Sequence, residues 1–157
     1  MEWQGIYGRE VGNNLAEDIK TRLKGTTNGI IHIGADSKVK SENICFIVVV
    51  AVMSGGEGSP ISRLAYFKRE NISDKHNEYS TKRRLLEEAY KSINVALELE
   101  PHFDFPLIIH IDANPDIKFK SSKYIKQLIG MVVGNGFDYR VKPDAWAAQT
   151  IADKLTK

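Results

Sequence analysis

Apolar and polar positions in the first half of the chain follow the short period of β-strands. Residues 30–33 form a short apolar strand that runs into Asp36 in a polar turn. Residues 44–53 are almost continuously apolar, which suits a strand buried on both faces. A glycine-rich connection, 54–60, then leads to alternating residues at 62–70. This pattern predicts three strands in an antiparallel meander.

The period changes to three and four residues in the second half. The longest such pattern predicts a helix over 79–98 with a wide apolar stripe, and Pro101 and Pro106 end it before the next strand. A shorter pattern with an asparagine cap and a glycine stop predicts a helix over 14–24. The remaining expected elements are a strand at 107–111, a helix at 121–133, a strand at 137–141 and a final helix that opens at Asp144.

The order of these elements is β-β-β-α-β-α-β-α, with an N-terminal extension at 1–29 that carries the short helix. Three antiparallel strands followed by alternating helices and strands predict an α/β protein with a mixed five-stranded sheet. No repeat, low-complexity segment or linker divides the sequence, so we expect residues 1–157 to form a single domain.

Composition narrows the functional classes only a little. The 157 residues are 42% hydrophobic and 27% charged, with a formal net charge of +2, so a nucleic-acid binder would need its basic residues clustered locally. The lone Cys45 lies in an apolar run and predicts a buried thiol. The longest apolar run is about half of the ~20 residues of a membrane span, and no leader precedes it, which favours a cytoplasmic protein without membrane attachment.

Known site motifs are mostly missing. The sequence has no phosphate-binding loop, dinucleotide fingerprint or serine-nucleophile motif. His32 and His110 lie within expected strands and are interpreted as core histidines, and no histidine has the spacing of a zinc ligand. The candidate chemistry therefore rests on carboxylates.

Three aspartates stand at the ends of expected elements. Asp36 follows the first strand in Ile33-Gly34-Ala35-Asp36-Ser37, Asp112 follows the fourth strand in His110-Ile111-Asp112-Ala113-Asn114, and Asp144 opens the last helix in Lys142-Pro143-Asp144-Ala145-Trp146. In this order the sequence resembles the ribonuclease H-like superfamily and, more narrowly, the YkuK-type bacterial proteins. The resemblance implies a three-layer α/β/α fold and a phosphodiester-cleaving activity.

The resemblance also implies a set of metal ligands. Asp36, Asp112 and Asp144 would hold Mg²⁺ or Mn²⁺, which prefer oxygen ligands and activate water for attack on a phosphodiester. A fourth acid is expected from the first long helix, where Glu88 is preferred to Glu78 and Glu87. Lys82 falls on the apolar stripe of that helix, where an acid would be expected.

Simpler interpretations of each acid remain open. Asp36 and Asp112 could only begin turns, and Asp144 could only complement the dipole of the helix that it opens. The glutamates of the long helix could form ordinary ion pairs on a solvated face.

A site for nucleic acid also needs positive charges that bind the phosphates of the substrate. The candidate substrate-binding residues follow the first acid, open the long helix or surround the fourth-strand acid: Lys38, Lys82, Arg83, Lys120 and Lys123. The leading hypothesis is a metal-dependent nuclease that acts on RNA, DNA or a hybrid. The alternative is a catalytically inactive module of the same fold that binds nucleic acid or a protein partner, and the oligomeric state stays open.

Overall fold

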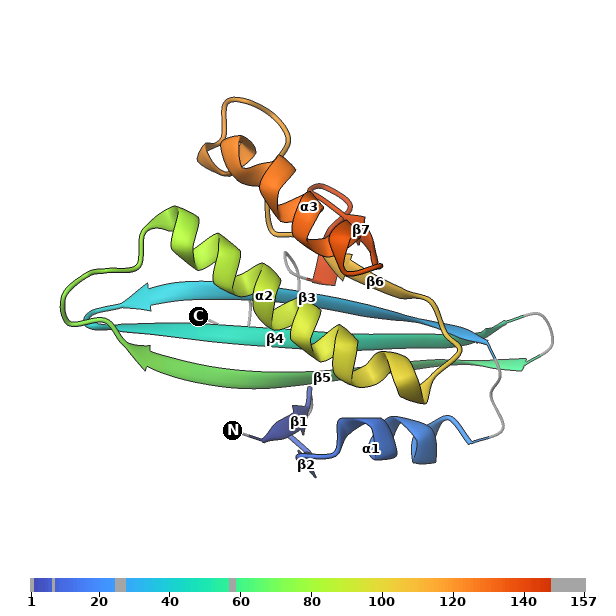
Figure 1. Ribbon diagram of the computed structural model, residues 1–157. Helices are drawn as coiled ribbons and strands as arrows, with labels where there is room; N and C mark the ends of the chain where they lie inside the picture. Colours follow the sequence, from blue (N-terminus) through green and yellow to red (C-terminus); the bar gives the residue numbers. More distant parts are fainter. Residues whose placement is uncertain (1, 7, 25–27, 57–58, 148–157) are drawn as a thin grey trace.

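The protein is built around one mixed sheet of seven strands (Figure 1). The structure, a computed structural model, describes residues 2–6, 8–24, 28–56 and 59–147. The order of strands across the sheet is β2-β1-β5-β4-β3-β6-β7. The mixed α/β architecture was predicted, but the prediction of five strands was wrong.

Three long strands form the centre of the sheet. They are β3 (Gly29–Lys40), β4 (Asn43–Gly56) and β5 (Ser59–Ser73), and each pairs antiparallel with the next. The predicted meander is therefore confirmed. Asp36 does not lie in a turn, however, because β3 stays paired with β4 from Asp36 opposite Ile47 as far as Lys40. The turn comes later, at Ser41, which has a positive φ of 55°.

Two shorter strands extend the sheet beyond β3. β6 (Leu107–His110) pairs parallel with β3, and β7 (Asp138–Arg140) pairs parallel with β6. Two parallel strands must be joined by a crossover connection, and the helices between these strands provide it. β3 and β6 therefore end at the same side of the sheet.

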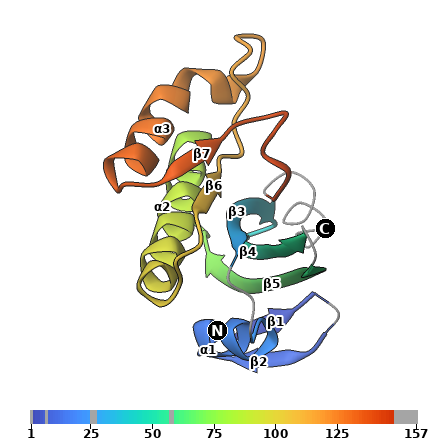
Figure 2. The same cartoon turned by 90° about the vertical axis from the view of Figure 1, so that its right-hand side faces the viewer.

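The two longer helices cover one face of the sheet, as both views show (Figures 1 and 2). α2 (Thr81–Leu99) packs against β3 and buries a face that includes Ala89, Ile93 and Ala96. α3 (Ile125–Gly134) follows a 3₁₀ turn, η2 (Lys120–Tyr124), and packs against α2 through its buried residues Leu128 and Val132. A further 3₁₀ turn, η1 (Glu100–His102), ends α2. Both helices were predicted from their apolar period.

The N-terminal extension adds the two unpredicted strands at the β5 edge (Figure 2). β1 (Trp3–Gly5) pairs with β5, and β2 (Glu10–Gly12) pairs with β1. These three-residue strands are too short to show a period, but the burial of Trp3 anchors them. The short helix α1 (Leu15–Arg22) was predicted, and Asn14 caps it by accepting a hydrogen bond from the Glu17 amide at 3.2 Å.

Asp18 of α1 ties this extension to the sheet. It accepts hydrogen bonds from Arg9 Nη2 at 2.6 Å and from the Tyr66 hydroxyl on β5 at 2.8 Å. The hydrogen bond from Arg9 lowers the pKa of the Asp18 carboxyl, and the one from Tyr66 acts in the same direction. Cys45 is buried and free, as predicted. The predicted final helix lies mostly outside the described residues, and none of the helices that the structure does describe is long and apolar enough to cross a membrane.

Candidate metal centre

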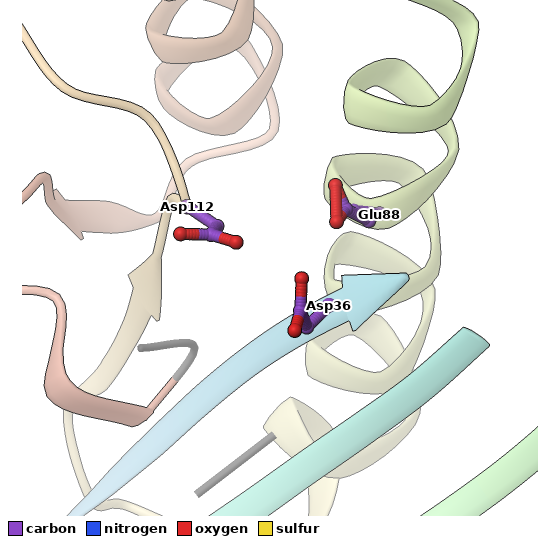
Figure 3. A group of neighbouring side chains, drawn as sticks. All are labelled: Asp36, Glu88 and Asp112. Carbon is purple, nitrogen blue, oxygen red and sulfur yellow. The ribbon is translucent and has the colours of Figure 1, made fainter. Parts of the chain in front are cut away.

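Three carboxylates from separate elements meet beside the sheet (Figure 3). Asp36 comes from β3, Glu88 from α2 and Asp112 from the segment that follows β6. One oxygen atom of each lies within 4.8 Å of one oxygen atom of the other two. We call these three residues the carboxylate group.

Strand register explains why the two aspartates meet. The last pair between the parallel strands β3 and β6 joins Gly34 to His110. Asp36 and Asp112 each follow that pair by two residues. Because the two strands run in the same direction, both aspartates therefore lie at the same height along the strands. Beyond His110, β6 ends while β3 continues, which leaves room for the two carboxylates to face each other (Figure 3).

The third carboxylate reaches the group because it lies on the buried side of α2. Glu88 is only 6% exposed and shares the packed face of the helix with Ala89 and Ser92. The side-chain hydroxyl of Ser37, next to Asp36 on β3, donates a hydrogen bond to Glu88 Oε1 at 3.2 Å. Arg84, one turn earlier on α2, donates to the Ser37 carbonyl oxygen and hydroxyl, each at 3.4 Å. Ser37 and Arg84 therefore fix the position of Glu88.

Burial and charge act together on the protonation of Glu88. Burial raises the pKa of its carboxyl well above the usual range, and the negative charges of Asp112 and Asp36 raise it further. The positive charge of Arg84 and the hydrogen bond from Ser37 oppose this rise. Without a cation, the group thus favours a protonated Glu88 beside two aspartates.

Lys142 supplies a positive charge on the other side of the group. Its Nζ atom lies 2.7 Å from Asp112 Oδ1, and both side chains are largely shielded from solvent, with exposed fractions of 32% and 16%. The segment before Lys142 is held by β7, and the Lys142 amide donates to the Ala113 carbonyl oxygen at 3.2 Å. The ammonium is thus held close to Asp112 by backbone pairing.

The donor set fits a hard divalent cation. Three carboxylates from three elements offer only oxygen ligands, which Mg²⁺ and Mn²⁺ prefer over nitrogen and sulfur. Glu88 and Asp112 also line one small cavity of about 10 Å³, room for about one water-sized particle. A larger cavity of about 520 Å³ lies elsewhere, between the N-terminal strands and β4–β5, and none of these carboxylates lines it.

The structure does not bring every candidate acid to this place. Asp144 is exposed and is not one of the three carboxylates of the group. Glu78 is exposed and Glu87 is half-buried, and neither belongs to the group. Lys82, which stood in doubt on the apolar stripe, is exposed at the start of α2 and therefore leaves Glu88 unhindered.

The candidate substrate-binding residues are all on the surface. They are exposed on β3, in the first turn of α2 and along η2, and comprise Lys38, Lys82, Arg83, Lys120 and Lys123. The elements that carry most of them, α2 and η2, are in contact with each other.

The two strand histidines belong to the core, as predicted. Each is less than 4% exposed, and His32 Nδ1 lies 2.9 Å from His110 Nε2. The Ala147 amide donates to His110 Nδ1 at 3.1 Å, so Nε2 must carry the proton and donate to His32. Trp146 packs against both rings, with centroid distances of 4.6 Å to His32 and 4.8 Å to His110. The histidines therefore fasten the segment after β7 to the sheet.

Two residues of this centre, Ser37 and Lys142, were missed in the sequence, whereas Arg84 could be recognised from its spacing as an ion-pair partner of Glu88. Ser37 is adjacent to Asp36, and Arg84 precedes Glu88 by four residues, a spacing that places both on one side of a helix. Lys142 is adjacent to Pro143, and nothing in its local pattern distinguishes it from a surface lysine.

Comparisons with known proteins agree with this architecture. The sequence profile described as ribonuclease H-like matches residues 11–157. The chain belongs to the ribonuclease H-like family. Its fold is accordingly the mixed α/β fold of this family, whereas no curated protein matches its sequence.

Solved structures that resemble this ribonuclease H-like protein share little sequence with it. One is LC9-RNase H1, a type 1 RNase H with the type 2 active-site motif, which is 12% identical, with 83% of this chain and 70% of that chain covered and a TM-score of 0.45. Another is the N-terminal RNase H domain of Rv2228c from Mycobacterium tuberculosis, solved as a fusion with maltose-binding protein. It is 8% identical, with 81% of this chain and 93% of that chain covered and a TM-score of 0.37.

Proposed function

We propose that this protein is a divalent-metal-dependent nuclease that hydrolyses phosphodiester bonds of nucleic acid. The single observation that carries the proposal is the carboxylate group, in which oxygens from Asp36, Glu88 and Asp112 come within 4.8 Å of one another. Three acids so close would repel one another without a cation, and the pKa of Glu88 is raised by burial first and by this repulsion in addition. Membership of the ribonuclease H-like family supports the same reaction class.

In this proposal the three carboxylates hold Mg²⁺ or Mn²⁺. The bound cation would supply an activated water and stabilise charge on the phosphodiester. Ser37 and Arg84 keep Glu88 directed at the group, and Lys142 keeps Asp112 in place through their 2.7 Å contact. Exposed cations of α2 and η2 would hold the phosphates of the substrate.

Cleavage assays with matched variants test this proposal. RNA, DNA and hybrid substrates are incubated with Mn²⁺ and the wild-type protein, Asp36→Asn or Asp138→Asn. Asp36→Asn removes one ligand charge with little change of shape, whereas Asp138 is exposed on β7 and serves as the matched control. We expect cleavage by the wild type and the control and a loss of at least about a hundredfold in Asp36→Asn. Equal cleavage by Asp36→Asn would refute the assignment.

A catalytically inactive member of the family is the alternative proposal. Lys142 favours it, since a positive charge 2.7 Å from Asp112 competes with a divalent cation for that carboxylate. In that case the protein would bind nucleic acid with Asp36-independent affinity and cleave no substrate on the panel in either Mg²⁺ or Mn²⁺.

Within the family, we propose that the protein belongs with the YkuK-type bacterial proteins. The terminal Lys142-Pro143-Asp144 segment and the Ile33-Gly34-Ala35-Asp36-Ser37 strand support this grouping. Cytoplasmic action on nucleic acid is part of the same proposal. Fractionation of cells that express the tagged protein tests the location.

A further inference from the structure

The segment from Asn114 to Tyr124 presents apolar and basic side chains to solvent beside the carboxylate group. It begins two residues after Asp112, and in Figure 1 its first part projects beyond the edge of the sheet before η2 begins. Ile117 is 93% exposed and Phe119 is 45% exposed, although both are large and apolar. Lys118, Lys120 and Lys123 are exposed among them. We call this segment the basic-aromatic loop.

The loop is ordered by its own hydrogen bonds. The Asn114 amide donates to Ser121 Oγ at 3.0 Å, which closes the loop at its base. The Asp116 amide donates to Asn114 Oδ1 at 2.9 Å, and the Lys118 amide donates to Asp116 Oδ1 at 3.1 Å. These bonds order the backbone on which the exposed Ile117 and Phe119 stand. Two exposed apolar side chains on an ordered loop are therefore available to a partner.

Aromatic rings and cations are paired within the loop. Lys118 Nζ lies 5.2 Å from the centroid of the Phe119 ring, and Lys123 Nζ lies 5.6 Å from that of Tyr124. A third pair lies at the N-terminus of α2, where Arg83 Cζ is 3.9 Å from the ring of Tyr79, which precedes the helix. The two elements that carry or adjoin these pairs, η2 and α2, contact each other. A ligand there would meet rings and positive charges together.

Nucleic acid offers both complements of this surface, namely negative phosphates and flat apolar bases. In a duplex the base faces are stacked inside, so the lysines could reach phosphates while Phe119 and Ile117 would contact no base face. In a single strand the base faces are free to stack on a ring. The exposed Phe119 and Ile117 therefore favour a single strand over a duplex as the ligand.

We propose that the basic-aromatic loop binds single-stranded nucleic acid, with a base stacked on Phe119 and phosphates held by Lys118, Lys120 and Lys123. The choice of nucleic acid as partner rests on the proposed function. The loop leads the strand to the carboxylate group, because Asp112 and the first residue of the loop are only two positions apart.

Binding is measured by fluorescence anisotropy with a labelled single strand of about 15 nucleotides and with the same sequence as a duplex, both in EDTA so that no cleavage occurs. Wild type, Phe119→Ala and Lys120→Gln are compared with the control Tyr90→Ala, which removes an exposed ring (56%) from another part of the surface, on α2. Each protein is measured at several salt concentrations. Circular dichroism checks that each variant is folded, and Ile117→Ser, at a 93% exposed position, provides a second variant without a folding risk.

We expect the wild type to prefer the single strand. Phe119→Ala should weaken that binding on the order of tenfold without changing its salt dependence, because stacking is not ionic. Lys120→Gln should lower the slope of log K against log salt by about 0.7, the value for one phosphate contact on a single strand. Ile117→Ser should weaken single-strand binding in the same direction as Phe119→Ala, and Tyr90→Ala should leave it unchanged.

Equal or tighter binding of the duplex, or unchanged binding in both Phe119→Ala and Ile117→Ser, would overturn the inference. The outcome is separate from that of the proposed function. Single-strand binding that depends on Phe119, without Asp36-dependent cleavage, would support the loop and refute the nuclease. Cleavage that depends on Asp36, together with single-strand binding that does not change in Phe119→Ala, would support the nuclease and refute the role of the loop.

Discussion

Lys142 Nζ lies 2.7 Å from Asp112 Oδ1, so one carboxylate of the proposed metal centre already has a positive partner from the protein itself. The two residues come from segments 30 positions apart that the parallel pairing of β6 and β7 brings together. A divalent cation at Asp112 therefore has to share that carboxylate with an ammonium or displace it.

Removal of the Lys142 charge should tighten metal binding. An ammonium beside the shared carboxylate repels a divalent cation bound there, so Lys142→Met should raise Mn²⁺ affinity by about fivefold or more. Calorimetric titration with Mn²⁺ measures this. Lys142→Arg retains the charge and should bind like the wild type, and Lys126→Met, an exposed lysine on α3, controls for net charge. Weaker Mn²⁺ binding by Lys142→Met would mean that the lysine positions Asp112 more than it competes.

The raised pKa of Glu88 predicts that metal binding releases protons. A cation requires the ionised carboxylate, whereas burial and the two aspartates favour the protonated acid. Mn²⁺ affinity should accordingly rise with pH until the raised pKa of Glu88 is passed. Titrations at one pH in buffers of different ionisation enthalpy give the number of protons released. That number should fall in Glu88→Gln and stay the same in Glu87→Gln, its half-buried neighbour.

The same pKa shift predicts how metal-free stability depends on pH. Above pH 4.5 the folded protein retains a proton on Glu88 that the unfolded chain has lost, so rising pH lowers the free energy of unfolding until the raised pKa is passed. Glu88→Gln stays neutral and should lose this dependence. Urea denaturation in EDTA at several pH values measures it. Parallel pH profiles for the wild type and Glu88→Gln would argue against a protonated Glu88.

The buried histidine pair predicts acid sensitivity with the opposite sign. Burial lowers the pKa of His32 to about 4 and that of His110 to about 3, and nearby Arg140 adds to both shifts. Below pH 6.5 the histidines of the unfolded chain bind protons, whereas those of the folded protein stay neutral. As the pH decreases, the free energy of unfolding should therefore fall by about 1.4 kcal/mol per pH unit for each histidine, until the pH reaches the lowered pKa values. His32→Gln can still accept the His110 hydrogen bond and should show a shallower fall. His76→Gln, in an exposed loop, should retain the steep one.

Helices and strands with a clear apolar period could be predicted from the sequence. Very short strands and the contacts set by strand pairing could not. The meander, α2 and α3 follow from apolar repeats, whereas Glu87 and Glu88 both flank the apolar stripe of their helix, so the stripe alone did not single out Glu88. β1 and β2 were missed since three residues show no period. The extension of β3 through Asp36 depends on pairing with β4, and the Lys142–Asp112 contact depends on pairing between β6 and β7, so neither is visible in local sequence.

Asp144 provides the last prediction, because the sequence and the structure point in different directions. The family resemblance implies a metal ligand at this position, whereas the exposed Asp144 stands outside the carboxylate group. On the observed geometry, Asp112→Asn should weaken Mn²⁺ binding at least tenfold, since it removes a charged ligand, whereas Asp144→Asn should change it by less than about threefold. Calorimetry gives both affinities and the number of ions bound. A large loss in Asp144→Asn would place a fourth carboxylate in the metal-bound centre, which requires the segment after Lys142 to move toward Asp112 when the cation binds.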